Sequence, residues 1–249
     1  MPLTDTHCHL HLYEDPDAVA RRSEGRGMGI VSLPTGPDEF ATVRDLAARV
    51  PFVHAGAGLV PQRARECLGR LDEVVDAVRA TRWVGEIGLD GVTDDAEDRA
   101  AQRAVFDRLV AVAAERGDAV LSVHSRRAEA DVIDRVGQGF PGTVILHWFS
   151  GGPRWLDRVG PCVWFSVNPA MAASNRSRPF LEALPRERVL LESDGPFVHH
   201  GDRPAEPSDL HTVVEALRRI WSLSTRDAMA QLVSNEARAL APGRRDGAP

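Results

Sequence analysis

Eight short apolar segments rich in valine and isoleucine recur along the chain, and this repetition constrains the fold more than any other feature. Each segment has the length and composition of a strand that is buried on both faces. Stretches with apolar residues at helical spacing lie between several of them. We predict strands at residues 3–9, 29–34, 52–57, 83–88, 119–124, 144–149, 163–167 and 189–194, and helices at 15–24, 68–80, 96–116, 208–221 and 224–240.

Strands that alternate with helices indicate a parallel sheet with helices packed on it. A count of eight strands favours closure of the sheet into a (β/α)8 TIM barrel. An open, doubly wound sheet is the alternative, but no G-x-G-x-x-G fingerprint follows the first strand. We therefore predict an α/β fold of the (β/α)8 TIM barrel class.

The length of 249 residues fits one barrel domain, and the hydrophobic content of 43% can supply its core. We predict a single domain over residues 1–241 and a disordered tail at 242–249. The chain has no run of 18 apolar residues and no opening signal segment. Its three scattered cysteines are typical of reduced thiols. Together these features favour a cytoplasmic protein.

The net charge of −6 argues against a basic surface that would bind nucleic acid over the whole molecule. Any phosphate binding is then local and depends on arginine. All thirty basic residues are arginines. No lysine is available to form a Schiff base or, once modified, to bridge two metal ions.

Histidines occupy alternate positions near the start of the chain, in LTDTHCHLHLY. His7 and His9 share one face of the first strand, because side chains alternate along a strand. In a TIM barrel the chemistry lies at the carboxyl ends of the strands, where four more polar residues fall. A lone histidine there is as often a satisfied rim residue as a ligand, but six such residues favour a metal site. The six candidate ligands are His7, His9, Glu86, His124, His147 and Asp194.

Four imidazoles and two carboxylates are too many for one tetrahedral ion, so we expect two divalent ions about 3.5–4 Å apart. This mixed set suits zinc, manganese or iron, and magnesium is left open. Glu86 is the expected bridge, because a carboxylate has two oxygens to share. The expected groups are His7, His9 and Asp194 around one ion, and His124 and His147 around the other.

Two carboxylates neutralise only half of the positive charge of two divalent ions. The remaining charge favours an anionic substrate such as a phosphodiester. The ions would lower the pKa of bound water and hold the attacking and leaving oxygens. Asp194 could accept the proton of that water. Asp194 and Glu86 are therefore the predicted catalytic residues.

Four further residues are candidates for substrate contact. Arg126 can donate two hydrogen bonds to a phosphate, with a rim salt bridge as the alternative. Trp148 can stack on a base, with core packing as the alternative. Glu192 shares a strand face with Asp194, where it orients a ligand, binds a third ion or forms a buried ion pair. His11 is expected in a loop at the pocket mouth rather than as a seventh ligand.

Taken together, these motifs resemble those of the TatD-like metal-dependent hydrolases, which are amidohydrolase-like barrels. DTHCHL is similar to their D-x-H-x-H, GEIGLD to their central glutamate motif, and HSR, HWFSG and ESDGP to their later motifs. The order is the same over residues 3 to 240. The resemblance implies a metal-dependent deoxyribonuclease that trims single-stranded DNA from its 3′ end.

A subset of the motifs, including HSRRA, LHWFSG and CVWFSVNPAM, resembles the QatD group of TatD-like nucleases in Qat anti-phage systems. These systems also encode an ATPase, a small partner and a QueC-like enzyme. The resemblance implies antiviral defence beside such partners. Two positions depart from the pattern, since His11 replaces an aspartate and Ser193 replaces a threonine.

Two other classes of function stay open. An amidohydrolase-type enzyme would hydrolyse a C–N or ester bond in a small nucleotide-like substrate. The absence of lysine disfavours those forms that need a carboxylated lysine between two ions. A partner-dependent subunit of a defence complex could have lost its activity, but all six candidate ligands are present. The leading prediction is therefore a deoxyribonuclease.

Overall fold

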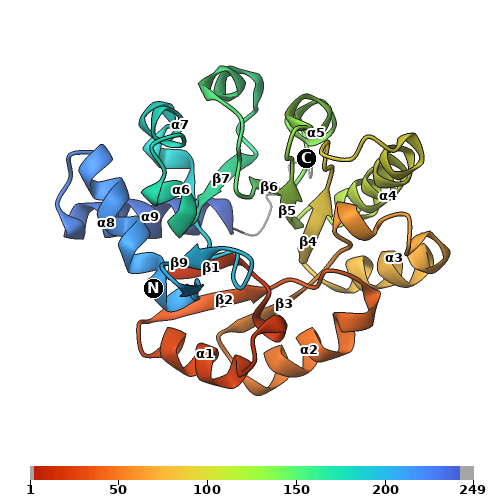
Figure 1. Ribbon diagram of the computed structural model, residues 1–249, viewed down its shortest axis with the longest axis horizontal. Coiled ribbons are helices and arrows are strands. Elements are labelled where there is room, and N and C mark those ends of the chain that lie inside the picture. Colours follow the sequence, from red (N-terminus) through yellow and green to blue (C-terminus); the bar gives the residue numbers. More distant parts are fainter. Residues whose placement is uncertain (1–2, 242–249) are drawn as a thin grey trace, which may run out of the picture.

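The computed structural model describes residues 3–241, in which eight parallel strands close into a barrel surrounded by helices (Figure 1). Neighbouring strands pair in chain order, and β1 pairs with β8 to close the sheet. The strands are β1 (Leu3–Cys8), β2 (Met28–Ser32), β3 (Val53–Ala57), β4 (Trp83–Gly88), β5 (Val120–His124), β6 (Thr143–Leu146), β7 (Val163–Val167) and β8 (Val189–Leu191). The predicted (β/α)8 fold is confirmed, and each strand overlaps its predicted range. The tail predicted at 242–249 lies outside the described residues.

The strands are apolar because the barrel buries both of their faces. One buried cluster joins side chains of six strands, among them Val31 in β2, Ile145 in β6 and Leu190 in β8. Ala239, the last residue of α9 (Thr225–Ala239), belongs to the same cluster, and its carbonyl oxygen accepts a hydrogen bond from Thr143 at the start of β6. Helix α9 therefore covers the amino-terminal end of the barrel. The carboxyl ends of the strands form the opposite rim.

The helices lie outside the barrel (Figure 1). They are α1 (Pro16–Glu24), α2 (Phe40–Arg49), α3 (Leu71–Ala80), α4 (Ala96–Ala114), α5 (Glu129–Val136), α6 (Pro169–Ala173), α7 (Arg178–Ala183), α8 (Leu210–Ile220) and α9. The five predicted helices are confirmed as α1, α3, α4, α8 and α9. No helix was expected at α2, α5, α6 or α7, although α2 buries a stripe of Phe40, Val43 and Leu46. A short hairpin, β9 (His199–His200) with β10 (Arg203–Pro204), lies in the loop after β8.

Two irregularities in strand pairing lie at candidate ligands. The pairing of β1 with β2 shifts between Asp5 and Cys8, an interval that contains His7. The pairing of β4 with β5 shifts in the interval that contains Glu86. Such bulges re-aim side chains and are common next to active sites. Local backbone irregularity therefore contributes to the direction of both side chains.

The three cysteines, Cys8, Cys67 and Cys162, are free thiols, as the sequence predicts. Among residues 3–241, no helix combines the length and the apolar character that a membrane crossing requires.

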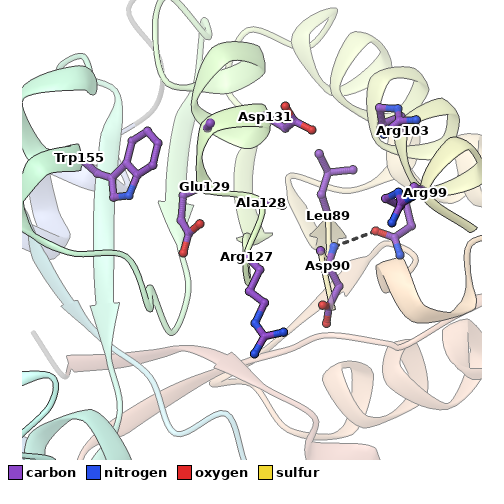
Figure 2. A pocket seen from close by; sticks show the side chains of 12 residues that line it. Leu89, Asp90, Arg99, Arg103, Arg127, Ala128, Glu129, Asp131 and Trp155 are labelled. Atoms are coloured by element: carbon purple, nitrogen blue, oxygen red, sulfur yellow. Dashed lines mark hydrogen bonds between the residues drawn. The ribbon is translucent and has the colours of Figure 1, made fainter. Parts of the chain in front are cut away.

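A cavity of about 300 Å³ lies outside the barrel, between α4 and α5 and beside the end of β4 (Figure 2). Three arginines and three carboxylates line it, so their formal charges balance. They are Arg99, Arg103, Arg127, Asp90, Glu129 and Asp131. Asp90 connects this cavity with the barrel rim, because its carboxylate contacts His124.

Candidate metal centre

The structure brings all six candidate ligands together at the carboxyl end of the barrel. They are His7 in β1 and His9 directly after it, Glu86 in β4, His124 at the end of β5, His147 directly after β6 and Asp194 in the loop after β8. Five of them are buried, and His124 is half-buried. Their strands are separate in sequence, so only closure of the barrel produces this cluster.

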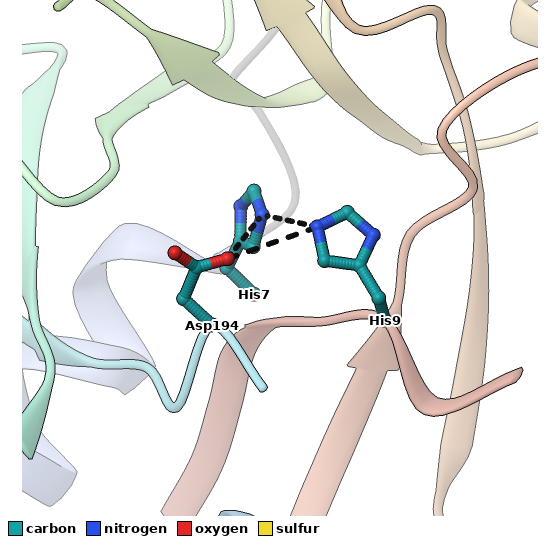
Figure 3. A group of neighbouring side chains, drawn as sticks. All are labelled: His7, His9 and Asp194. Atoms are coloured by element: carbon teal, nitrogen blue, oxygen red, sulfur yellow. Dashed lines mark hydrogen bonds and ion pairs between the residues drawn. The ribbon is translucent and has the colours of Figure 1, made fainter. Parts of the chain in front are cut away.

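His7, His9 and Asp194 form the first group of donor atoms (Figure 3). The Nε2 atoms of His7 and His9 are 3.2 Å apart. They lie 3.6 Å and 3.7 Å from Oδ1 of Asp194. Metal–ligand bonds of about 2.0–2.2 Å at tetrahedral angles place donor atoms roughly 3.4 Å apart. The three donor atoms are thus spaced as ligands of a single ion.

Glu86 lies between this first group and a second group formed by His124 and His147. Its Oε2 is 3.5 Å from Nε2 of His7 and 3.4 Å from Nε2 of His9. Its Oε1 is 2.9 Å from Nδ1 of His124 and 3.1 Å from Nε2 of His147. The latter two nitrogens are 3.3 Å apart. One carboxylate oxygen therefore faces each group, as a bridging ligand requires.

Contacts on the far side of the rings decide which histidine nitrogen faces the centre. Nδ1 of His7 is 2.7 Å from Oγ of Ser122, and Nδ1 of His9 is 2.8 Å from the carbonyl oxygen of Leu33. An outer hydrogen bond of this kind fixes the tautomer and the orientation of a ligand ring. Nε2 of both rings is left as the donor toward the centre.

Asp90 holds His124 in the same way. Its Oδ2 is 3.1 Å from Nε2 of His124 and accepts a hydrogen bond of 2.7 Å from the amide of Gln62. Its backbone N–H donates to Oε1 of Gln102 at 2.8 Å. Nδ1 of His124 is thereby turned toward the centre. Sequence analysis missed Asp90, although it lies in the GEIGLD motif four residues after Glu86.

Burial and neighbouring charges set the ionisation of these groups. Burial and the charge of His147 hold the pKa of His7 well below its ordinary 6.5, and burial lowers the pKa of His147. Burial also opposes charge on His124, but hydrogen bonds to Asp90 and Glu86 outweigh it and raise that pKa to about 9. Although burial raises the pKa of Glu86, the charge of His147 and hydrogen bonds from the histidines hold it well below its usual range. Glu86 is therefore a carboxylate.

The carboxylate of Asp194 shows that this donor set fits a cation. Asp194 is 3% exposed, and within residues 3–241 no hydrogen bond to its carboxylate is present. Burial and the charges of Glu192 and Glu86 raise its pKa well above 3.8. Its φ of +48° lies in the left-handed region that non-glycine residues rarely adopt. A buried carboxylate that faces other carboxylates requires a positive charge beside it.

The TatD related DNase family matches residues 4–241 of the chain. The chain belongs to this family. As a TatD-related DNase, it is a metal-dependent hydrolase that acts on phosphoester bonds. The family match covers the whole barrel, including every candidate ligand.

Similar proteins are matched over nearly their full lengths. The 3′-5′ ssDNA/RNA exonuclease TatD of Edwardsiella piscicida is 30% identical over 90% of this chain and 92% of its own. The uncharacterized metal-dependent hydrolase TatD of Mycobacterium tuberculosis is 27% identical, and the match covers 97% of this chain and 98% of that protein. The crystal structure of YjjV, a TatD homologue from Escherichia coli, matches with a TM-score of 0.86 at 24% sequence identity. The match covers 95% of this chain and 97% of YjjV. The last comparison supports the fold.

Two residues of this TatD-related DNase that were predicted to contact substrate are buried. Glu192 has no exposed surface, and its carboxylate accepts hydrogen bonds from the backbone of Trp148 and from Asn168. This burial argues against substrate contact, whereas Oε2 of Glu192 lies 3.8 Å from Nδ1 of His147, which supports the alternative that Glu192 orients a ligand. Nε2 of His11 is 2.7 Å from Oε2 of Glu39, and the His11 side chain is 3% exposed. This burial also argues against substrate contact by His11.

Arg126 and Trp148 are exposed at the rim. Arg126 follows His124 by two residues, and its guanidinium forms no ion pair or hydrogen bond with residues 3–241. Trp148 directly follows His147. Both side chains are accessible to a substrate at the centre, so their roles stay predictions of the sequence.

Proposed function

We propose that this chain is a divalent-metal-dependent deoxyribonuclease that acts as an exonuclease on single-stranded DNA. The proposal depends on the position of Glu86, because its two carboxylate oxygens face two different groups of donor atoms. Two-metal phosphodiesterases use such an arrangement to hold the attacking and the leaving oxygen. The Edwardsiella relative is named a 3′-5′ ssDNA/RNA exonuclease, which supports single strands and the 3′ end as the substrate.

We infer that the centre holds two divalent ions, with Zn²⁺, Mn²⁺ and Mg²⁺ as the candidates. When bound, the ions supply positive charge that lowers the pKa of water and stabilises charge on the phosphate. Imidazole ligands favour zinc or manganese over magnesium. The proposed ligands are His7, His9 and Asp194 for one ion, His124 and His147 for the other, and Glu86 for both.

Side chains of the protein supply the remaining functions. Glu86 stays ionised and fixes the spacing of the two groups. One oxygen of Asp194 faces the histidines, and its other oxygen can accept the proton that the attacking water loses. Arg126 can donate two hydrogen bonds to the phosphate. Glu86 and Asp194 are therefore the proposed catalytic residues.

The test uses single-stranded DNA labelled at the 5′ end in one sample and at the 3′ end in another, with Mn²⁺ or Mg²⁺. We expect a ladder from the 5′-labelled strand and immediate release of the 3′ label. Glu86→Gln should abolish cleavage, whereas Glu182→Gln, which changes an exposed carboxylate on α7, should not. Failure of the metal-loaded wild type to cleave would overturn the proposal. A C–N or ester substrate, or a partner-dependent subunit, would then be favoured.

We also propose that the chain acts in cytoplasmic anti-phage defence beside a Qat-type ATPase, a small partner and a QueC-like enzyme. The support is the resemblance of HSRRA, LHWFSG and CVWFSVNPAM to QatD-type nucleases. Plaque counts on cells that carry the chain with its neighbouring genes test the role. Protection should disappear with Glu86→Gln. Protection that persists after deletion of the chain would overturn the proposal.

A further inference from the structure

Six large apolar side chains are exposed in residues 3–241, and five of them lie in connections that follow a barrel strand. One of the five, Leu68, follows β3, and the other four are Leu12, Val92, Trp148 and Phe197. Their loops follow β1, β4, β6 and β8, which carry or precede candidate metal ligands. Exposed apolar surface therefore gathers around the metal centre. Trp148 and Phe197 are the aromatic members of the set.

The two aromatic residues are associated with ligands of different groups of donor atoms. Trp148 directly follows His147 of the second group. Phe197 follows Asp194 by three residues, and its ring centroid is 4.9 Å from that of His9, at an interplanar angle of 69°. Phe197 thus has its ring beside the first group, and Trp148 is the sequence neighbour of a ligand of the second group.

The backbone of Trp148 has a φ of +37°, which is an outlier for a bulky residue. Its N–H donates a hydrogen bond of 2.8 Å to Oε1 of Glu192. Glu192 is completely buried and is itself held by Ser166 and Asn168. Strained backbone of this kind persists only where the surroundings enforce it, and it concentrates at functional sites. The fold therefore fixes a backbone conformation in which the indole is 41% exposed.

Phe197 is held at the rim by the residues around it. The N–H of Val198 donates to the carbonyl oxygen of Asp194 at 3.0 Å, and the Val198 side chain is buried. The N–H of Ala205 donates to the carbonyl oxygen of Val198 at 2.8 Å. Between these anchored residues, Phe197 is 55% exposed. Its ring is an ordered apolar surface that is accessible to a ligand.

We propose that Trp148 and Phe197 each stack on an unpaired base, on either side of the scissile phosphodiester, and so restrict this hydrolase to single-stranded ends. The inference rests on the proposed function, because it requires a centre that cleaves nucleic acid. Bases of any sequence offer a flat face to an aromatic ring. In a duplex, neighbouring bases cover those faces. The net charge of −6 gives little general attraction for phosphates, so stacking has to retain the strand.

Steady-state kinetics on a short single-stranded oligonucleotide with Mn²⁺ test the stacking residues. We expect KM to rise about tenfold in Trp148→Ala and in Phe197→Ala, with kcat nearly unchanged. Trp148→Phe should restore KM, because it keeps an aromatic face. Met229→Ala changes an exposed apolar residue on α9, away from the rim, and should leave KM at the wild-type value. The thermal unfolding temperature verifies that every variant folds.

An oligonucleotide with abasic sites at its 3′-terminal positions separates stacking from other roles of the two rings. It keeps the phosphodiesters but has no bases to stack at the centre. The wild-type KM for this strand should rise to the level of the alanine variants, which should show no further rise. The proposal is overturned if the alanine variants have the wild-type KM for the normal strand. It is also overturned if their KM rises by the same factor on the normal and the abasic strand.

The same reagents distinguish failure of this inference from failure of the proposed function. If the wild type cleaves neither strand, the proposed nuclease activity is wrong. Fluorescence anisotropy in the same Mn²⁺ buffer then measures binding directly. Weaker binding of the normal strand by Trp148→Ala and Phe197→Ala, without a change for the abasic strand, would support stacking. Equal binding by all variants would refute it.

Discussion

Each histidine of the candidate centre turns one ring nitrogen toward the other donors. In three of the four, an oxygen of Ser122, Leu33 or Asp90 holds the second nitrogen. His147 differs, because its Nδ1 has no hydrogen-bond partner in residues 3–241 and is 3.8 Å from Oε2 of Glu192. These outer contacts arrange the rings before a metal binds, so little ordering remains for binding to impose.

Asp90→Asn tests whether an outer contact positions its histidine. The substitution removes the charge that orients His124, so we expect kcat to fall about 10- to 100-fold with KM nearly unchanged. Metal titration should show weaker binding at the group of His124 and His147. Asp94→Asn, in the same loop and exposed, is the matched control. Wild-type kcat and metal affinity in Asp90→Asn would show that the contact has no positioning role.

Glu39 fastens the loop after β2 to the loop after β1. Its carboxylate accepts hydrogen bonds from the N–H and hydroxyl of Thr35 and pairs with His11. Although burial raises the pKa of Glu39, the bonds from His11 and Thr35 lower it from 4.5 to about 2. The folded state therefore prefers the carboxylate. The resulting stabilisation is complete above pH 4.5 and is lost as the pH falls toward 2.

Glu39→Gln should lower the free energy of unfolding by about 2 kcal/mol near neutral pH. Denaturant titrations of both proteins between pH 6 and pH 3 measure how this difference changes. We expect the two stabilities to converge as the pH falls below 4.5, where the wild-type carboxylate begins to lose its advantage. A difference that stays constant across the range would contradict this role of Glu39.

At the scale of elements, the strands were predictable because burial on both faces produces continuous apolar runs. The convergence of the six candidate ligands was predictable too, since strand parity and the barrel rule place strand-end side chains on one rim. Helix α2 was missed although Phe40, Val43 and Leu46 have helical spacing. Helix α5 spans 8 residues and therefore gives a short pattern.

The remaining parts of the site depend on contacts that form only in the folded chain. Asp90 lies in a loop, and its sequence position does not reveal that it meets His124. The buried hydrogen bonds of Glu192 connect it to Trp148, Ser166 and Asn168, and its strand parity with Asp194 does not reveal them. The exposure of Phe197 depends on how the loop after β8 folds, which no local pattern determines.

A substitution of Asn235 tests whether contacts at the amino-terminal end of the barrel affect stability without affecting catalysis at the carboxyl end. Its side-chain amide is fully buried and donates to the carbonyl oxygens of Arg186 and Val189, which joins α9 to the start of β8. Asn235→Ala should lower the free energy of unfolding by about 2 kcal/mol, because it leaves the buried carbonyl oxygen of Val189 and the partly buried one of Arg186 without this donor. Thermal and denaturant unfolding measure this loss. At temperatures where the variant is folded, kcat should match the wild type.

The matched control for this substitution is Asn175→Ala, which changes an exposed asparagine. It should leave both stability and kcat unchanged. A loss of kcat in Asn235→Ala without a loss of stability would contradict the separation of the two ends.

Over the whole molecule, one end of the barrel is covered by α9, and the other carries the candidate metal ligands, the exposed aromatic residues and Arg126. The acidic loop around residues 90–98 lies at this rim, and the chain carries a net charge of −6. Long-range attraction for a polyanion is therefore weak. Binding has to depend on contacts at the centre itself.

The salt dependence of DNA binding tests this distribution of charge. Each phosphate contact in a single strand contributes a slope of about −0.7 to log K against log salt. With Arg126 as the proposed phosphate contact, we expect a slope of about −0.7 and less than about tenfold loss of affinity from 50 to 200 mM salt. Fluorescence anisotropy at several salt concentrations measures it. A slope steeper than about −4 would reveal a phosphate-binding surface that this account lacks.

The number of metal ions that each chain binds decides whether the centre is binuclear. Mass spectrometry of metal content, after loading with Mn²⁺ or Zn²⁺ and removal of free ions, gives this number for the wild type and for Glu86→Gln. The account predicts two ions per chain in the wild type and at most one in the variant, because Glu86 offers one oxygen to each group of donors. A fully active wild type with a single ion per chain would contradict it.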